Sequence, residues 1–374
     1  MTGSTEQFLN SKRIFWGGEF MRKLFFVLML SLLLLPSLKA WAQQTEAPTV
    51  GEERREEQKK QTVATRVVEV ERGGALLPYG RLVIEPSFEY NHISGTNVSI
   101  SGFTIFQAIL IGRVQVQKLQ RDLFIPALTF RLGLKKAELY TRIPYFFRTD
   151  RLVFPESSGG TANILDRSFS DNGMGDITSY IYYHLLQEGQ WKPWVPDTVI
   201  RVGVSFPTGK DPYDIRREFV QELGAVVPVE FPTGTGHWGL SFGSTFVRSA
   251  DPAVFFLNVA YFINFPRFVG EVNDVNFGNI NLGNTFEYSV GLILSLQERL
   301  SMNFALNQRI TGKTTQDGAS LPDSSLNSIS FNIGATYVIP PRMAVDFVVG
   351  IGLSEDAPDV SVLIRMPIMF KFGK

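Results

Sequence analysis

The chain has 374 residues, no cysteine, and equal numbers of basic and acidic residues, 36 of each; 44% of its residues are hydrophobic. This composition is too apolar for a disordered chain. The zero net charge gives no reason to expect a polyanionic partner, so no nucleic acid is predicted. Without cysteine there are no disulfides, no thiol catalysis, no thiolate metal sites and no lipid-modified cysteine anchor.

The N-terminal part resembles an export signal. Arg22 and Lys23 precede an apolar run over 24–35, and an A-x-A cleavage site ends at Ala42. Residues 1–42 are therefore predicted to be an N-terminal extension plus a secretory signal peptide, with the start at Met21 and cleavage after Ala42. An uncleaved membrane anchor is the alternative, although the run is short for a spanning helix.

Residues 43–79 are mostly polar and charged, and they are predicted to form a periplasmic tether. Glu56 and Lys60 are spaced for a helical ion pair, so a short solvated helix is the alternative there. From Gly80 to Lys374 the pattern changes to strand-like runs separated by turns and polar loops.

In chain order, the predicted strands of the 80–374 region cover 81–92, 123–134, 137–148, 175–187, 197–207, 238–249, 253–265, 284–297, 299–311, 327–339, 342–353 and 359–372. The segment 99–118 is ambiguous: it holds one strand, holds two, or turns partly inward. The connections alternate between short and long along the chain. Short turns on one rim and long loops on the other are typical of an outer-membrane barrel. We predict an all-β fold: a transmembrane antiparallel up-and-down β-barrel of about 12–14 strands, an even number.

Each strand has one apolar and one polar face. In 284–297, Phe286, Tyr288 and Val290 alternate with Glu287 and Ser289. A soluble sandwich would also bury the apolar faces against each other. The polar faces, however, carry small residues rather than the Lys and Glu of a solvated sheet, and aromatic residues mark the ends of the apolar stripes. Arg or Lys facing lipid would cost about 2–4 kcal/mol each. We therefore expect the apolar faces to contact outer-membrane lipid and the polar faces to line a lumen.

The predicted lumen residues are charged or amide side chains on the polar faces. They are Arg131, Glu138, Arg142, Arg201, Glu287, Asn303, Asn307, Arg309, Asp346 and Arg365. Opposite charges in a narrow lumen are expected to pair. Such pairs could set an electric field for a permeant, or could simply hold the barrel closed; the sequence leaves both interpretations open.

Several motifs resemble chemical sites but lack the required context. Gly234, Gly236 and Gly239 match G-x-G-x-x-G, yet a strand follows instead of a helix. The run from Gly203 to Asp211 has the wrong spacing for a phosphate loop, and Asp166, Asp171 and Asp176 do not have EF-hand spacing. His184 has no arguable nucleophile partner in the sequence. We predict no catalytic residue, no cofactor, no metal and no enzyme activity.

The longest predicted loop, 208–236, contains Ile215, Phe219, Leu223 and Val226 at helical spacing. This spacing predicts a short helix that folds over or into the mouth of the barrel as a constriction. A loop that lies on the outer rim is the alternative.

Four stretches, 76–90, 173–186, 202–213 and 234–262, resemble the transporter family named for the MetA pathway of phenol degradation. Their shared features are Gly-Asp before a strand, Pro-Thr-Gly after one, and a Gly- and Trp-rich strand entry. The resemblance implies an outer-membrane barrel that passes small hydrophobic or aromatic compounds, and it implies no catalytic residues. An outer-membrane channel or transporter for passive passage of small molecules is therefore predicted, with the barrel assembly machinery as a partner. A barrel-embedded hydrolase and a structural or adhesive surface protein are the alternatives.

Overall fold

A computed structural model describes residues 76–95, 99–100, 103–104, 118–154, 165–220, 225–228, 230–272, 275–322 and 324–371. The predicted signal peptide and most of the predicted tether lie outside these residues. Within the described part of the chain, no helix is long and apolar enough to cross a membrane.

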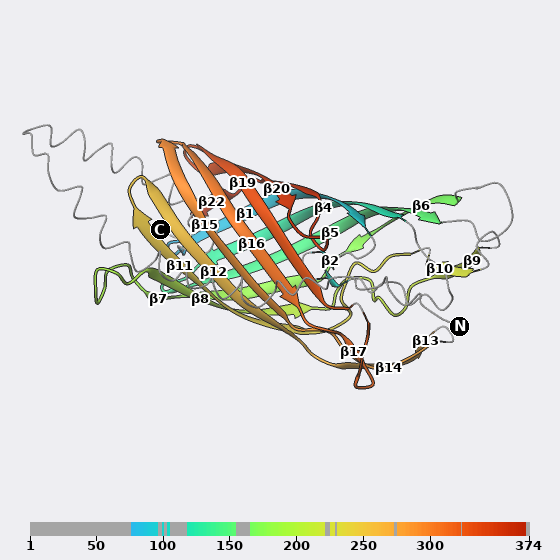
Figure 1. The fold of residues 1–374 in the computed structure, drawn as a ribbon. Helices are drawn as coiled ribbons and strands as arrows, with labels where there is room; N and C mark the ends of the chain where they lie inside the picture. The colour runs from blue at the N-terminus through green and yellow to red at the C-terminus, as the bar shows by residue number, and fades with distance from the viewer. Residues whose placement is uncertain are drawn as a thin grey trace, which may run out of the picture. The chain divides into compact units, whose positions relative to one another are not determined.

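The wall is a closed antiparallel barrel of 12 strands (Figure 1). In chain order its strands are β1 (Arg81–Gly95), β4 (Lys118–Gly133), β5 (Ala137–Phe154), β6 (Leu165–Met174), β7 (Ile177–Leu186), β8 (Asp197–Phe206), β11 (Gly239–Ala250), β12 (Ala253–Asn264), β15 (Thr285–Gln297), β16 (Leu300–Thr311), β19 (Leu326–Ile339), β20 (Met343–Gly352), β21 (Val360–Arg365) and β22 (Ile368–Lys371). The barrel closes because β1 pairs with β4 on one side and with β21 and β22 on the other.

Two wall strands are interrupted. β6 and β7 both pair antiparallel with β5, one along 145–154 and the other along 137–142, so they form one broken strand. β21 and β22 likewise divide the last strand at Met366 and Pro367, where proline cannot donate a ladder hydrogen bond. Each broken strand counts once in the wall.

The connections separate into two rims, as the sequence predicts. Short turns lie between β4 and β5, β11 and β12, β15 and β16, and β19 and β20. The other rim carries three short hairpins: β9 (Arg217–Val220) with β10 (Ala225–Pro228), β13 (Arg267–Val272) with β14 (Val275–Asn281), and β17 (Thr315–Gln316) with β18 (Ala319–Ser320). Figure 1 shows β9, β10, β13, β14 and β17 beyond the same end of the barrel. By the rule for such barrels, the rim with short turns is the periplasmic one.

The ambiguous segment 99–118 adds no wall strand among its described residues. β2 (Ser99–Ile100) and β3 (Phe103–Thr104) pair only with each other, and β4 begins at Lys118. The lower end of the predicted range, 12 strands, is the observed number.

The helix predicted within 208–236 is wrong for the described residues, because 217–220 and 225–228 pair as the hairpin β9–β10. An isolated short helix is marginally stable without a partner surface. Val226 and Val227 are β-branched and favour extended backbone. Pairing with the preceding strand therefore overrides the helical spacing.

The outward faces form an apolar belt around the barrel. Phe88, Phe124, Phe147, Phe242 and Phe347 are each 39–47% exposed although they are large and hydrophobic. In water such a surface would cause aggregation. Lipid chains are the environment that fits it, so the strands span a membrane.

An arginine at the middle of this belt tests that orientation. Leu292→Arg is expected to lower the free energy of unfolding in lipid by about 2–4 kcal/mol, because the charge faces hydrocarbon. Leu296→Arg, near the periplasmic end of the same β15 face, is the matched control, and it should cost about 0–1 kcal/mol. Denaturant titrations in vesicles measure both. Equal losses at the two positions would contradict the lipid-facing assignment.

Candidate functional site

The ten predicted lumen residues all lie on the face opposite the exposed apolar belt. Register shows the pattern: Glu287 pairs with Arg309 inside, while the neighbouring Phe286 pairs with Ile310 outside. Arg131 lies in β4, Glu138 and Arg142 in β5, Arg201 in β8, Glu287 in β15, Asn303, Asn307 and Arg309 in β16, Asp346 in β20, and Arg365 in β21. They fall into separate groups along the barrel.

The central group connects opposite walls of the barrel. Arg142 of β5 lies 3.3 Å from Glu89 of β1, and Arg309 lies 2.6 Å from Glu287. Arg309 also interacts electrostatically with Glu89 and with Tyr180 of β7. Since β1, β7 and β16 are not neighbours in the sheet, these interactions cross the interior. We call these residues the central layer. It consists of Glu89, Arg142, Glu287 and Arg309, together with Tyr140, Tyr180, Tyr182 and Arg201, which are described next.

Three tyrosine rings belong to the central layer. Tyr140 of β5 is 5.7 Å from Tyr180 and 6.0 Å from Tyr182, and the latter two rings are 6.1 Å apart. These separations and tilts are favourable for aromatic pairs. Alternation puts Tyr180 and Tyr182 on one face of β7 but does not by itself assign that face, because polar and aromatic residues share it. The register with Glu138 and Arg201 decides the direction.

Arg201 of β8 completes the central layer. It is in register with Tyr182 on one side and with Gly243 of β11 on the other. A Cβ atom on Gly243 would lie 2.7 Å from the Arg201 Nε atom, so the glycine makes room for the arginine. The Nε atom is buried and has no hydrogen-bond partner.

A second charged group lies nearer the outer rim, and sequence reasoning missed it. Asp150 accepts hydrogen bonds from Arg121 at 2.6–2.7 Å and from Arg148 at 2.6–2.9 Å, and all three side chains are at most 5% exposed. The loop before β11 places the ring of Phe231 4.0 Å from the Arg148 guanidinium carbon. Position 150 was predicted to lie in a loop, whereas β5 continues to Phe154. The strand extension carries Asp150 onto the inward face.

A third group lies toward the periplasmic rim. Glu138 accepts a hydrogen bond from Arg131 Nε at 2.6 Å and another from the backbone N–H of Leu77 at 2.8 Å. Arg365 pairs with Asp346, which also accepts from Thr336 at 2.8 Å. Leu77 is 2% exposed, so the segment before β1 is held at the barrel mouth. Beside it is a cavity of about 940 Å³, lined by residues of the turns before β5, β8 and β20 and by the Leu76–Gly80 segment.

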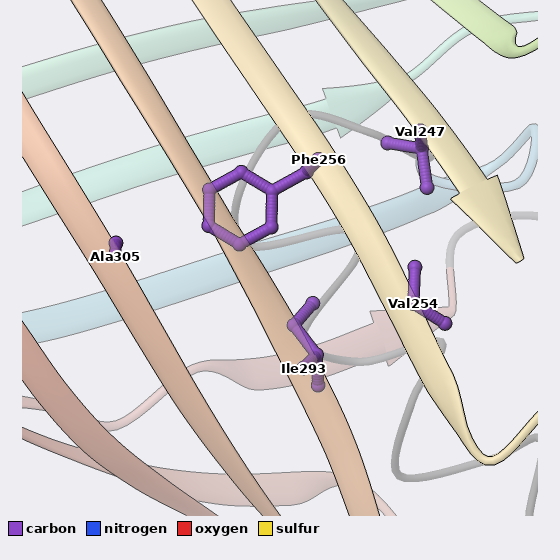
Figure 2. Packing of buried hydrophobic residues seen from close by; sticks show 5 residues of the cluster. All are labelled: Val247, Val254, Phe256, Ile293 and Ala305. Carbon is purple, nitrogen blue, oxygen red and sulfur yellow. The ribbon is translucent and has the colours of Figure 1, made fainter. Parts of the chain in front are cut away.

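Part of the inward surface is apolar. Val247, Val254, Phe256, Ile293 and Ala305 come from four consecutive strands, β11 to β16, and pack together (Figure 2). A Cβ atom on Gly291 would lie 2.5 Å from Phe256 Cζ, so the ring lies over this glycine. The inward face therefore carries a buried apolar cluster as well as the charged groups.

The remaining predicted polar residues have mixed surroundings. Asn303 is fully buried and is in register with Gly334, while Asn307 is half-buried and in register with Ser330. His184 lies at the periplasmic cavity, where its Nε2 atom is bonded to Asp197.

Two of the three aspartates that lack EF-hand spacing, Asp171 and Asp176, attach the outer loops. Asp171 binds Lys210 Nζ at 2.7 Å and accepts from the backbone N–H of Phe231 at 2.9 Å. Asp176 accepts from the backbone N–H groups of Gly209 at 3.0 Å and Thr235 at 2.8 Å. The loop between β8 and β11 is thereby attached beside the β6–β7 break. No group of three metal-ligating side chains occurs among the described residues.

A pH-sensitive contact joins two outer loops. The Tyr213 hydroxyl is 2.6 Å from His237 Nε2, and His237 Nδ1 is 2.9 Å from the Phe265 carbonyl oxygen. A carbonyl only accepts, so Nδ1 carries the proton and Nε2 accepts from the tyrosine. Burial lowers the pKa of His237, and the nearby Arg267 lowers it further. The folded loops therefore favour the neutral imidazole.

Acidification should loosen this loop contact. A histidine with a depressed pKa binds protons more readily when unfolded, so the stability it contributes is lost as the pH falls below about 6.5. We expect faster hydrogen exchange of the amides around Tyr213 and Phe277, which pack together, at pH 5 than at pH 7.5 after correction for intrinsic rates. His237→Gln should lose this pH dependence. The same pH response in the variant would assign the effect to other groups.

Comparison with known proteins shows which solved structures the barrel resembles and which family it belongs to. A search of solved structures matches the COG4313 outer membrane channel from Pseudomonas putida F1 at 15% identity, covering 79% of this chain and 97% of that one, with a TM-score of 0.52. The NalP autotransporter translocator domain from Neisseria meningitidis (10% identity, 87% and 100% coverage, TM-score 0.42) and the P. putida toluene transporter TodX (9%, 80% and 91%, 0.40) are more distant. The first match supports the fold.

Residues 88–366 match the family described as "Putative MetA-pathway of phenol degradation". These residues include most of the barrel wall, and the chain belongs to this family.

Proposed function

We propose that the protein is a passive outer-membrane channel for small molecules, among them hydrophobic and aromatic compounds. The central layer is the observation that carries this proposal. It brings Glu89, Tyr180 and Arg309 from separate parts of a closed wall within electrostatic range inside the lumen. A lumen narrowed by charged and aromatic side chains selects solutes by size and chemistry, whereas a wide water-filled pore does not.

The family and the structural relative support the same function. The family description concerns phenol degradation, and the P. putida relative is titled an outer membrane channel. A cell that degrades an aromatic compound needs it to cross the outer membrane first. The inward face also carries the apolar cluster around Phe256, so the interior is not purely charged.

The lumen assignment and the export route belong to this proposal. The ten residues from Arg131 to Arg365 named above line the permeation route in their three groups. Residues 1–42 direct export through the secretory pathway, 43–79 form a periplasmic tether, and the barrel assembly machinery inserts 80–374. Outer-membrane lipid surrounds the apolar belt.

Uptake by cells tests the function. A strain lacking its general porins, expressing this protein, should take up radiolabelled phenol faster than the same strain with an empty vector. Purified protein in planar bilayers should give solute-dependent current fluctuations with small aromatic compounds. Uptake equal to the vector control, together with bilayers that show no current, would refute the channel function. Heat-modifiable gel mobility of the expressed protein verifies that the barrel is present and folded, so that absence of uptake is not absence of protein.

A further inference from the structure

We propose that Arg201 and the rings of Tyr140, Tyr180 and Tyr182 form a binding site for small aromatic acids, meaning a single ring that carries a carboxylate. This inference rests on the proposed channel function and specifies which permeants the central layer retains. Its residues come from β5, β7 and β8, three consecutive strands of the wall. The site is therefore built on rigid sheet and not on a loop.

Arg201 differs from six other inward-facing arginines of the described wall, while a seventh, Arg81 at the periplasmic end of β1, donates to Met369 Sδ. Arg131, Arg142, Arg309 and Arg365 pair with Glu138, Glu89, Glu287 and Asp346, and Arg121 and Arg148 share Asp150. Among the described residues, Arg201 has no such carboxylate partner, and its buried Nε has no hydrogen-bond acceptor. A buried N–H without an acceptor is unfavourable. An anionic ligand would satisfy it.

The surroundings of Arg201 favour an aromatic ligand. Tyr182 is its register neighbour on β7, so the guanidinium and the ring lie side by side on the inward face. Both Tyr180 and Tyr182 interact electrostatically with Arg201. A planar ring can contact the tyrosine rings edge to face, while its carboxylate accepts hydrogen bonds from the Arg201 fork.

Two glycines let Tyr180 and Arg201 pack closely against the wall. A Cβ atom on Gly203 would lie 2.3 Å from Tyr180 Cδ1, and one on Gly243 would lie 2.7 Å from Arg201 Nε. Any larger residue at these positions would push the tyrosine and the arginine off the wall. Because both positions are glycine, the two side chains can lie flat against the strands.

The site is also suited to releasing its ligand. Glu287 interacts electrostatically with Arg201 as well as with Arg309. Its negative charge reduces the attraction of Arg201 for an anion without occupying the guanidinium. Conduction requires binding that is favourable but weak enough to reverse. An aromatic acid would therefore pause at Arg201 and leave again.

Calorimetric titration of the purified full-length barrel in detergent tests the site with three probes. Benzoate has the ring and the charge, benzamide has the ring without the charge, and cyclohexanecarboxylate has the charge without the aromatic ring. We expect benzoate to bind about tenfold tighter than either of the others, since the charge-assisted hydrogen bonds and the ring contacts act together. This comparison uses the unmodified protein, so it does not depend on the folding of a variant.

Substitutions then locate the site. Arg201→Gln should remove the preference for benzoate over benzamide. Arg248→Gln should keep it, because Arg248 lies on the outward face of neighbouring β11 beside Glu188 and the Pro193 carbonyl. Equal binding of benzoate and benzamide by the unmodified protein, or an unchanged preference in folded Arg201→Gln, would overturn the proposal. Either result leaves phenol uptake unaffected, so it is distinguishable from failure of the channel function.

Discussion

Replacing Asp150 by asparagine is expected to lower the free energy of unfolding by about 3–5 kcal/mol, the cost of removing one member of a buried ion cluster. The carboxylate is 2% exposed and neutralises two arginines, Arg121 and Arg148, which are 5% and 4% exposed. Asparagine has nearly the same volume but no charge. The variant therefore leaves two buried like charges side by side with one neutral acceptor between them.

Denaturant titration of the refolded protein in vesicles measures this loss. The matched control is Glu230→Gln, which removes the carboxylate of an exposed pair with Arg216 at 3.4 Å. Exposed pairs contribute about 0–1 kcal/mol, so the control should shift the transition little. Similar shifts in the two variants would show that water reaches the Asp150 cluster.

Loss of the Asp150 cluster should also free the ring of Phe231, which stacks on Arg148. The conductance of the outer mouth should therefore rise.

Replacing Phe256 by alanine is expected to lower the free energy of unfolding by about 3–5 kcal/mol, because it leaves a cavity in the apolar cluster. Phe256 is 3% exposed and packs with Val247, Val254 and Ile293 (Figure 2). Its ring also covers Gly291, which has no side chain to fill the vacated space. Because Phe256 lies on the inward face, truncating it also removes volume from the interior, so conductance should rise as stability falls.

The adjacent residue supplies the control for this substitution. Phe255 is 40% exposed on the outward face of the same strand, and lipid chains can fill the space left by Phe255→Ala. Its loss of stability should be smaller and its conductance should be unchanged. If Phe255→Ala changes conductance and Phe256→Ala does not, the assignment of the two faces of β12 is reversed.

Much of the wall can be predicted from the sequence because the signal is local. In β15 and β16, alternation of apolar and polar residues identifies two strands, and the same alternation identifies the face on which Glu287 and Arg309 lie. The alternation of short and long connections then indicates a barrel and its orientation. Prediction was weaker where local signals conflict. In 208–236 helical spacing suggested a helix, and the described residues form the hairpin β9–β10.

The contacts within the sites cannot be predicted from the alternation of apolar and polar residues alone. Arg121 and Asp150 are in register only because β4 and β5 both extend well beyond their predicted ends. Tyr180, Glu89 and Arg309 are distant in sequence and lie on strands that are not adjacent. No spacing rule predicts that they come within electrostatic range of one another. The lack of a carboxylate partner for Arg201 among the described residues is likewise not predictable from the sequence, because it depends on which carboxylates pair with the other arginines.

By itself, then, the sequence determined the all-β class, the strand faces and the two rims, because side-chain alternation and turn chemistry act over a few residues. Only the tertiary structure decided the number of strands in the closed wall, the partners of each charge and the place of the tyrosine rings. The physical reason is closure. Side chains on opposite walls become neighbours only after β1 pairs with both β4 and the last strand, and a barrel of different strand number would bring different residues together.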